Sequence, residues 1–169
     1  MGRRPARCYS TPDRPPYTRK KYIKGGPESK IRIFDIGSPG KDFTDEVHLY
    51  AMKERLVSHN CLEAARITVN RYMTENVTRD KFHFRVCVFP HHIIRENKIL
   101  SGAGADRVSD GMRLAFGRPM GKAAIVKDGQ KLLSIRVDKD NIIAAKEALR
   151  RAKFKFPMRT RVAVLEKEN

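Results

Sequence analysis

The candidate residues for metal binding or acid–base catalysis, chosen by type and spacing, fall between positions 91 and 110. His91 and His92 precede Glu96, and Asp106 and Asp110 sit further along. Zinc-binding histidines on a helix are one turn apart, whereas adjacent histidines point to different faces, and the sequence holds no second Cys/His cluster. The two aspartates lie beside arginines, so we expect them to hold the shape of their own loop. The sequence therefore predicts no metal site, no cofactor and no catalytic residues.

A glycine-rich run at 101–106 (SGAGAD) is superficially similar to a phosphate-binding loop. It lacks the GxGxxG spacing and the terminal Gly-Lys-Ser/Thr of a P-loop, so nucleotide binding is not expected. The run belongs to a stretch, 97–122, with five of the chain's eleven glycines and neither helical nor alternating periodicity. We expect a long loop here, because loops of this length in compact domains are usually functional or disordered and this one is too apolar for a solvated linker. Interleaved Arg107, Arg113 and Arg118 predict a polyanionic partner.

The charge of the chain points to the same kind of partner. Lys plus Arg number 36 against 19 Asp plus Glu, a net charge of +17 with a pI near 10.2. Residues 1–30 hold nine cations and two acids, a net of +7, and residues 150–161 hold six cations and no acid, a net of +6. The middle of the chain is close to balanced, so the excess charge lies at two ends. A charge of this size indicates that a polyanion neutralises it.

The N-terminal segment, 1–30, is expected to be an arm rather than part of a folded core. Its five prolines and Gly25-Gly26 forbid a helix or a central strand. Tyr9, Tyr17 and Tyr22 stand among the cations, where aromatic rings suit stacking on bases or riboses. An RNA-bound arm is our prediction, and a plain disordered tail is the alternative.

The second basic segment, 150–157 (RRAKFKFP), follows an expected helix. The helix macrodipole favours cations at this position and the phenylalanines would anchor a core, which is the purely structural interpretation. That interpretation does not account for six cations without an acid in twelve residues. We therefore predict contacts with backbone phosphates.

The remaining pattern predicts an α+β fold: a mixed or antiparallel sheet with two helices on one face, formed by a single domain at 31–169. Alternating apolar residues predict strands at 31–36, 45–51, 82–89, 123–126, 131–137 and 161–165. The 123–126 and 131–137 strands are expected to pair as a hairpin around Asp128-Gly129. Helical periodicity predicts one helix from Ser58 or Asn60 to about Met73 and another from Asp138 or Asp140 to about Ala152.

Smaller features complete these expectations. Asn60 and Glu63 have capping-box spacing, and Asp138 or Asp140 is expected to cap the second helix. The three cysteines fit neither a disulfide framework nor a zinc site, and Cys61 and Cys87 are expected to be buried free thiols in a reducing cytoplasm. No apolar run is long enough to span a bilayer, and the basic start lacks the apolar region of a signal peptide.

Several blocks together resemble one protein family. The blocks are CLEAARITVNRYM (61–73), FHFRVCVFPHHIIRENK (82–98), KILSGAGADRVSDGMRLAFGRPMGKAA (98–124) and ALRRAKFKFP (148–157), with MGRRPARCY at the start. They are similar to the large-subunit ribosomal proteins called L-ten-e, the archaeal and eukaryotic counterpart of bacterial L-sixteen. The likeness covers residues 1–165. The chain ends at Asn169 without the longer C-terminal extension of eukaryotic members, so an archaeal member is expected.

The resemblance implies a structural, non-catalytic constituent of the large ribosomal subunit in the cytoplasm, with a fold of the α/β-hammerhead type. Family members bind large-subunit rRNA near the central protuberance, beside the aminoacyl-tRNA, with the long loop toward the peptidyl transferase region. The implied partners are rRNA, tRNA in the aminoacyl and peptidyl sites, and neighbouring ribosomal proteins, with no membrane and no small-molecule substrate. On this sequence the loop is 101–116.

The expected site residues fall into two groups. The rRNA-binding group is Arg3, Arg4, Arg7, Tyr17, Arg19, Lys20, Lys21 and Lys24 of the arm, with Arg150, Arg151, Lys153, Lys155 and Arg159. The group near tRNA and the peptidyl transferase region is Ser101, Gly102, Gly104, Asp106, Arg107, Arg113 and Arg118.

Two other classes of protein share part of this pattern. A free-standing RNA-binding regulator has the same charge distribution, and co-sedimentation with large subunits separates it from a ribosomal component. A small RNA-modifying enzyme would use Asp106, Asp110 or His91 and His92, and bound zinc in a metal assay would favour it.

Overall fold

A computed structural model describes residues 5–9, 11, 23–97, 113 and 116–166 of the chain. Its larger sheet has five strands in the order β1-β4-β7-β2-β8, and each neighbouring pair is antiparallel. These strands are β1 (Asp35–Gly37), β2 (Asp45–Ala51), β4 (Phe82–Val86), β7 (Lys131–Val137) and β8 (Thr160–Glu166). Strands were predicted at or overlapping all five places from the alternation of apolar residues.

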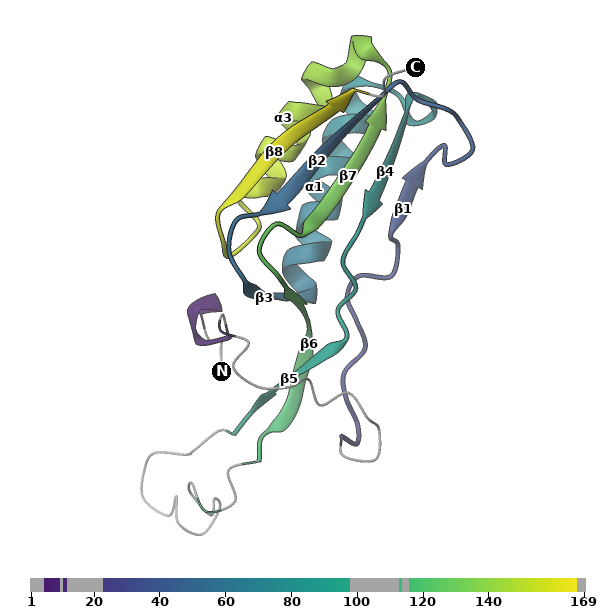
Figure 1. Cartoon of the computed structure of the whole chain (residues 1–169). Helices are drawn as coiled ribbons and strands as arrows, with labels where there is room; N and C mark the ends of the chain where they lie inside the picture. Colours follow the sequence, from purple (N-terminus) through teal and green to yellow (C-terminus); the bar gives the residue numbers. More distant parts are fainter. Residues whose placement is uncertain (1–4, 10, 12–22, 98–112, 114–115, 167–169) are drawn as a thin grey trace.

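Two helices, α1 (His59–Asn76) and α3 (Ile142–Lys153), cover one face of this sheet (Figure 1). The buried face is built from aligned rows, such as Val47, Ile135 and Phe84 on three adjacent strands. Leu62, Val69 and Met73 of α1 and Leu149 of α3 are fully buried against it. Each such side chain contributes about 1.5–3 kcal/mol of burial free energy. The predicted α+β fold with two helices on one face is confirmed.

A second sheet of three strands extends from the end of the first (Figure 1). Its order is β3-β6-β5, with β3 (Arg55–Ser58), β6 (Arg118–Val126) and β5 (His92–Glu96). Both neighbouring pairs are antiparallel. The chain passes from β3 directly into α1, so the small sheet is joined to the start of that helix.

The predicted hairpin of 123–126 with 131–137 is wrong. Asp128-Gly129 does form a turn, with Gly129 at φ +70°, but β6 and β7 belong to different sheets. The amide of Gly129 donates instead to the carbonyl of Ala51 (3.0 Å), and the Ala51 amide donates to the carbonyl of Gln130 (3.0 Å). The turn is therefore attached to the end of β2, and it moves the chain from one sheet to the other.

Other boundaries differ from the predictions. The first strand is only Asp35–Gly37, although Ile31 is buried before it. β6 begins at Arg118 rather than at residue 123, and β5 lies in a segment that was not predicted as a strand. Phe82, Phe84, Val86 and Val88 are buried as expected, but β4 ends at Val86. Short 3-10 helices occupy Ala6–Tyr9 (η1), Arg79–Lys81 (η2) and Lys139–Asn141 (η3).

The helix caps also differ. Ser58 is the N-cap of α1 and its hydroxyl accepts from the Cys61 amide (3.4 Å), whereas Asn60 lies inside the helix. Neither Asp138 nor Asp140 caps α3, because η3 precedes it, and the Asp138 carboxylate instead meets the Lys41 ammonium at 3.4 Å. The N-cap positions are therefore Ser58 for α1 and Asn141 for α3, each within three residues of a predicted cap.

The cysteines are less buried than predicted. Cys87 is exposed and Cys61 is half-buried, and both are free thiols. Cys87 follows directly after β4 and lines the same hollow as Arg85. No helix within the described ranges is long and apolar enough to cross a membrane.

Candidate nucleic-acid interface

The long loop leaves the fold from the β5–β6 hairpin, whose two strands pair from His92–Ala123 to Glu96–Arg118. At the last pair the backbones are very close. A Cβ on Gly117 would lie 2.7 Å from the backbone N and C of Glu96, so glycine is required there. The Arg95 guanidinium also lies 4.2 Å from the centre of the Phe116 ring, which it covers. The two ends of the loop are therefore held together.

Most of the predicted loop residues lie outside the described part of the chain: Ser101, Gly102, Gly104, Asp106 and Arg107. Arg113 is described and exposed. Arg118 is exposed as well, but it is the first residue of β6 rather than part of the loop. The hairpin thus presents Arg118 at the point where the loop begins.

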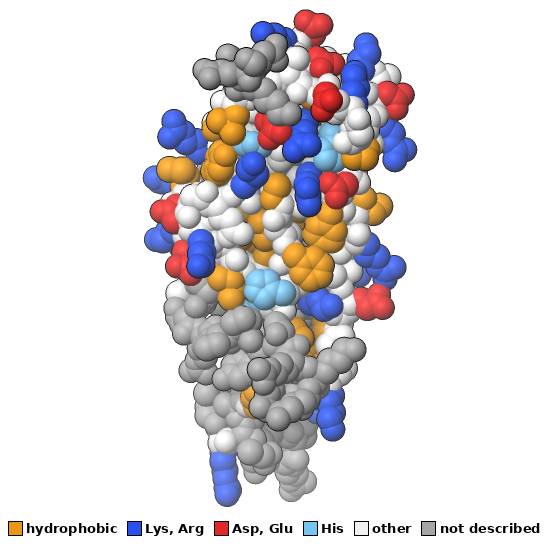
Figure 2. Space-filling view, turned by 45° about the vertical axis from the view of Figure 1, so that its right-hand side comes forward, with side chains coloured by type: hydrophobic (Ala, Val, Ile, Leu, Met, Phe, Trp, Pro, Cys, Tyr) orange, Lys and Arg blue, Asp and Glu red, His pale blue; other side chains and the backbone are white. Residues whose placement is uncertain are grey.

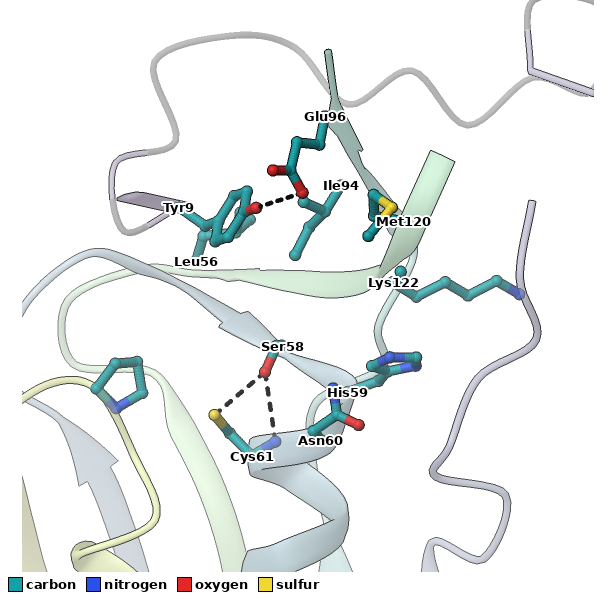
Figure 3. A pocket seen from close by; sticks show the side chains of 12 residues that line it. Tyr9, Leu56, Ser58, His59, Asn60, Cys61, Ile94, Glu96, Met120 and Lys122 are labelled. Atoms are coloured by element: carbon teal, nitrogen blue, oxygen red, sulfur yellow. Dashed lines mark hydrogen bonds between the residues drawn. The ribbon is translucent and has the colours of Figure 1, made fainter. Parts of the chain in front are cut away.

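The N-terminal arm contacts the same hairpin. Tyr9, at the end of η1, donates from its hydroxyl to Glu96 Oε2 at 3.3 Å (Figure 3). Gly26, near the end of the arm, faces Ile93 of β5. A Cβ added to Gly26 would lie 3.5 Å from Ile93 Cδ1. Lys24 is exposed beside this contact. Arg7 lies in η1, while Arg3, Arg4, Tyr17, Arg19, Lys20 and Lys21 lie outside the described residues.

A cavity of about 150 Å³ lies where these segments meet, and we call it the hairpin-base cavity (Figure 3). Tyr9 of the arm, Ile94 and Met120 of the hairpin, Ser58 at the start of α1 and Pro157 line it. Pro157 belongs to the turn between α3 and β8, inside the second basic segment. The arm, the base of the loop and the basic C-terminal turn therefore converge at one end of the molecule.

His59, which the sequence analysis did not single out, holds this end together. Its ring is buried, and Nδ1 accepts a hydrogen bond from the Lys30 amide at 3.0 Å. A Cβ added to Gly121 would lie 3.3 Å from His59 Nε2, so the ring packs directly on β6. The contact ties the start of α1 both to the hairpin and to the end of the arm. A lone histidine at the start of a helix gives no sequence signal for such a role.

The histidines considered for metal binding have ordinary structural environments. His91 Nδ1 lies 3.2 Å from the carbonyl oxygen of Phe89, and His92 is half-buried in β5. Burial, and then the neighbouring His91 and Arg95, lower the pKa of His92. Among the described residues, no three His, Cys, Asp or Glu side chains are grouped so that they would hold a metal ion.

The C-terminal basic cluster consists of Arg150, Arg151, Lys153, Lys155 and Arg159, and all five are exposed. Glu147, one turn earlier on α3, binds Arg150 (Nε to Oε2, 2.6 Å) and Arg151 (Nε to Oε1, 3.0 Å). The Arg151 guanidinium also covers the Tyr72 ring of α1 at 4.2 Å. The acid missing from residues 150–161 is therefore supplied by the preceding turn, and it orients two of the five cations.

The two phenylalanines of this segment have different roles. Phe156 is buried in the core, as the structural interpretation expects. Phe154 is 72% exposed between Lys153 and Lys155. Within the described ranges neither lysine forms an ion pair, so both remain available to a polyanion.

An α+β domain with basic segments converging at one end has the features of a polyanion-binding protein. Comparison with known proteins narrows this class. The family model described as "Ribosomal protein L16p/L10e" matches residues 12–163, and the chain belongs to this family.

Relatives named "Large ribosomal subunit protein uL16" match nearly the whole chain. The protein of Methanococcus aeolicus is 46% identical over 164 residues, covering 97% of this chain and 95% of the relative. That of Thermofilum pendens is 49% identical over 164 residues, with coverage of 97% and 98%. That of Hyperthermus butylicus is 45% identical over 170 residues, with coverage of 98% and 94%. All three are archaeal proteins, in agreement with the resemblance found from the sequence.

The close approach at the loop base generates a prediction. Gly117→Ala would push a methyl group against the Glu96 backbone, so we expect the free energy of local opening of the β5–β6 hairpin to fall by about 1–3 kcal/mol. Amide hydrogen exchange in β5 and the start of β6 should accelerate, while the five-stranded sheet keeps its protection. Gly26→Ala is the matched control, since its added methyl makes only an ordinary contact. Unchanged hydrogen exchange in the hairpin of Gly117→Ala would show that glycine is not required at this position.

The Glu147 ion pairs generate another prediction. Hydrogen bonds from Arg150 and then Arg151 lower the pKa of Glu147 to about 2, so the carboxylate is ionised throughout the pH range of RNA-binding assays. Because this folded-state pKa is depressed, any stability from these pairs is present at neutral pH and is lost as the pH falls toward 2.

Glu147→Gln therefore adds one net positive charge to the C-terminal basic cluster at pH 7. We expect RNA affinity to rise, with the slope of log K against log salt steeper by about 0.7–0.9. Fluorescence anisotropy with a labelled RNA at several salt concentrations measures both quantities. Glu75→Gln is the control, since it frees Arg71 on α1 and changes the net charge equally. The same response in both variants would show that the cluster makes no special contact.

Proposed function

We propose that this chain is a structural component of the large ribosomal subunit, where it binds large-subunit rRNA near the central protuberance and the aminoacyl-tRNA site. Its loop, 101–116, extends toward the peptidyl transferase region and helps to position tRNA in the aminoacyl and peptidyl sites. Its other partners are neighbouring ribosomal proteins, and its location is cytoplasmic, within the subunit. Family membership and the names of the relatives support this proposal.

The observation that carries the proposal is the convergence at the hairpin-base cavity. Tyr9 from the arm, Glu96 and Met120 from the hairpin, and Pro157 from the basic C-terminal turn line the same space. Each belongs to a segment that contains several cations in the sequence. A single RNA junction would contact all of these segments at once.

The proposed mechanism is positional. Cations of the arm (1–30) and of the C-terminal basic cluster displace counterions from rRNA phosphates, which supplies affinity without base readout. The folded domain, 31–169, fixes the directions in which these segments leave. The backbones of Glu96 and Gly117 approach closely, so the hairpin fixes the point at which the loop leaves the domain. Catalysis would then belong to the RNA, with the protein supplying geometry.

The regulator and the enzyme receive less support. The relatives that match nearly the whole chain are named as ribosomal proteins, which favours a ribosomal component over a free-standing regulator. An enzyme would need Asp106, Asp110, His91 and His92 to face a common site. His91 and His92 are instead engaged with the backbone and packed in β5, respectively.

The loop arginines test the finer part of the proposal. In Arg107→Ala/Arg113→Ala we expect the fold and its stability to be unchanged, since Arg113 is exposed, while tRNA accommodation or late subunit maturation is weakened. Cells carrying only the double variant should grow slowly and accumulate immature large subunits. Aminoacyl-tRNA binding to purified ribosomes measures the first effect, and sucrose-gradient profiles measure the second.

Arg71→Ala/Arg79→Ala is the matched control, because it removes the same charge from α1 and η2 at exposed positions. It should leave both readouts unchanged. Normal accommodation and normal maturation in the loop variant would refute the proposed role of the loop.

A further inference from the structure

The face of the five-stranded sheet opposite the helices holds a hollow of about 400 Å³ that the proposed interface does not use. We call it the open-face hollow, and Phe34, Arg85, Cys87, Phe89, Lys131 and Arg136 line it. Figure 2 turns the right-hand side of Figure 1 forward and shows apolar side chains with Lys, Arg, Asp and Glu side chains around them. Its volume lies within the ~300–1,000 Å³ that small-ligand sites occupy.

A pair of stacked aromatic rings forms one side of the hollow. The centres of the Phe34 and Phe89 rings are 5.5 Å apart with an angle of 29° between their planes. The Phe34 carbonyl accepts from the Val86 amide at 2.8 Å, which fixes this ring beside β4. Phe89 is 61% exposed, and the buried Pro90 follows it. The pair thus presents a supported aromatic surface to solvent, the kind of surface on which nucleobases stack.

Three cations surround these rings. Arg85 Nε lies 3.6 Å from Asp35 Oδ1, and Arg136 Nε lies 2.7 Å from Glu46 Oε1. The two arginine side chains remain 62% and 43% exposed. Lys131 is the third cation, and it has no carboxylate partner among the described residues. Three cations against two carboxylates leave the hollow with one excess positive charge, which matches one phosphate.

Two histidines on this face lie beside the two carboxylates. His48 is fully buried with Nε2 3.2 Å from Glu46 Oε2, and His83 Nε2 lies 3.3 Å from Asp35 Oδ1. Burial, then Lys131, lowers the pKa of His48, and the neighbouring Arg136 acts in the same direction against Glu46. Both acids of the hollow are thus already engaged by neighbouring side chains.

We infer that the open-face hollow binds one unpaired RNA nucleotide, with its base stacked on Phe89 and its phosphate against Arg85, Lys131 and Arg136. This inference deepens the proposed function, because it assigns a second RNA-contacting surface to residues outside the converging basic segments. An acidic protein segment would satisfy the cations as well. It would leave the exposed ring pair without a flat partner, so RNA is the occupant that the surface favours.

The test compares two probes on the full-length protein. One is a short labelled oligouridylate, and the other has the same phosphates and sugars but lacks bases. At moderate salt the phosphate contribution is equal for both probes, so the affinity ratio reports stacking. We expect Phe89→Ala to reduce the ratio of oligouridylate affinity to abasic-probe affinity about tenfold relative to the unchanged chain. Ile143→Ala, which removes an 81% exposed side chain from α3, should leave the ratio as it is.

A second readout locates the contact without altering the hollow. Cys87 is exposed and lines the hollow, so the base-containing probe should slow maleimide labelling of its thiol, read by peptide mass spectrometry. The abasic probe should protect it less. An unchanged ratio in Phe89→Ala, or equal Cys87 labelling with and without the oligouridylate, would overturn the inference. Equal protection by an acidic peptide would overturn it in favour of a protein partner.

The outcomes are separable from those of the proposed function. Loss of the hollow's stacking would leave association with the large subunit intact, since the converging basic segments are elsewhere. Stacking without any association with the large subunit would refute the ribosomal proposal and leave this inference standing.

Discussion

The contact between the two helices and one face of the five-stranded sheet determines the arrangement of everything else. Val47, Phe84, Ile135 and Leu149 are fully buried in this layer, and α1 also packs against α3. Because the layer buries apolar side chains from β1, β2, β4 and β7, charged side chains are excluded from it. Tyr9 of the arm, the β5–β6 hairpin and the turn after α3 meet outside this layer, at the end where β3 enters α1.

The meeting of these segments brings positive charges close together. With a net charge of +17, basic segments that meet at one cavity repel one another unless an anion lies between them. Glu147 relieves part of this repulsion by binding Arg150 and Arg151, and Glu96 binds Tyr9. These acids orient side chains but do not neutralise the whole charge. We propose that large-subunit RNA neutralises the remaining charge, and that the open-face hollow adds one stacked nucleotide.

The sequence predicted the parts of the fold that depend on short-range pattern. Alternation in β2 and helical periodicity in α1 are local, and both elements were placed correctly. Pairing between strands is not local: Asp128-Gly129 signals a reversal, but the reversal serves two different sheets. His92–Glu96 was missed because a strand of a narrow hairpin is half-buried on both faces and does not alternate. The RNA-binding residues were predicted from charge and stay a prediction, whereas the meeting of Tyr9 with Glu96 depends on tertiary contacts alone.

The most direct test of the central claim is sucrose-gradient fractionation of a lysate at moderate and high salt, with detection of this chain. We expect the chain to sediment with the large subunit at moderate salt, and to be released only as salt screens its phosphate contacts. A chain found only at the top of the gradient at moderate salt would contradict the account, although the fold would stand.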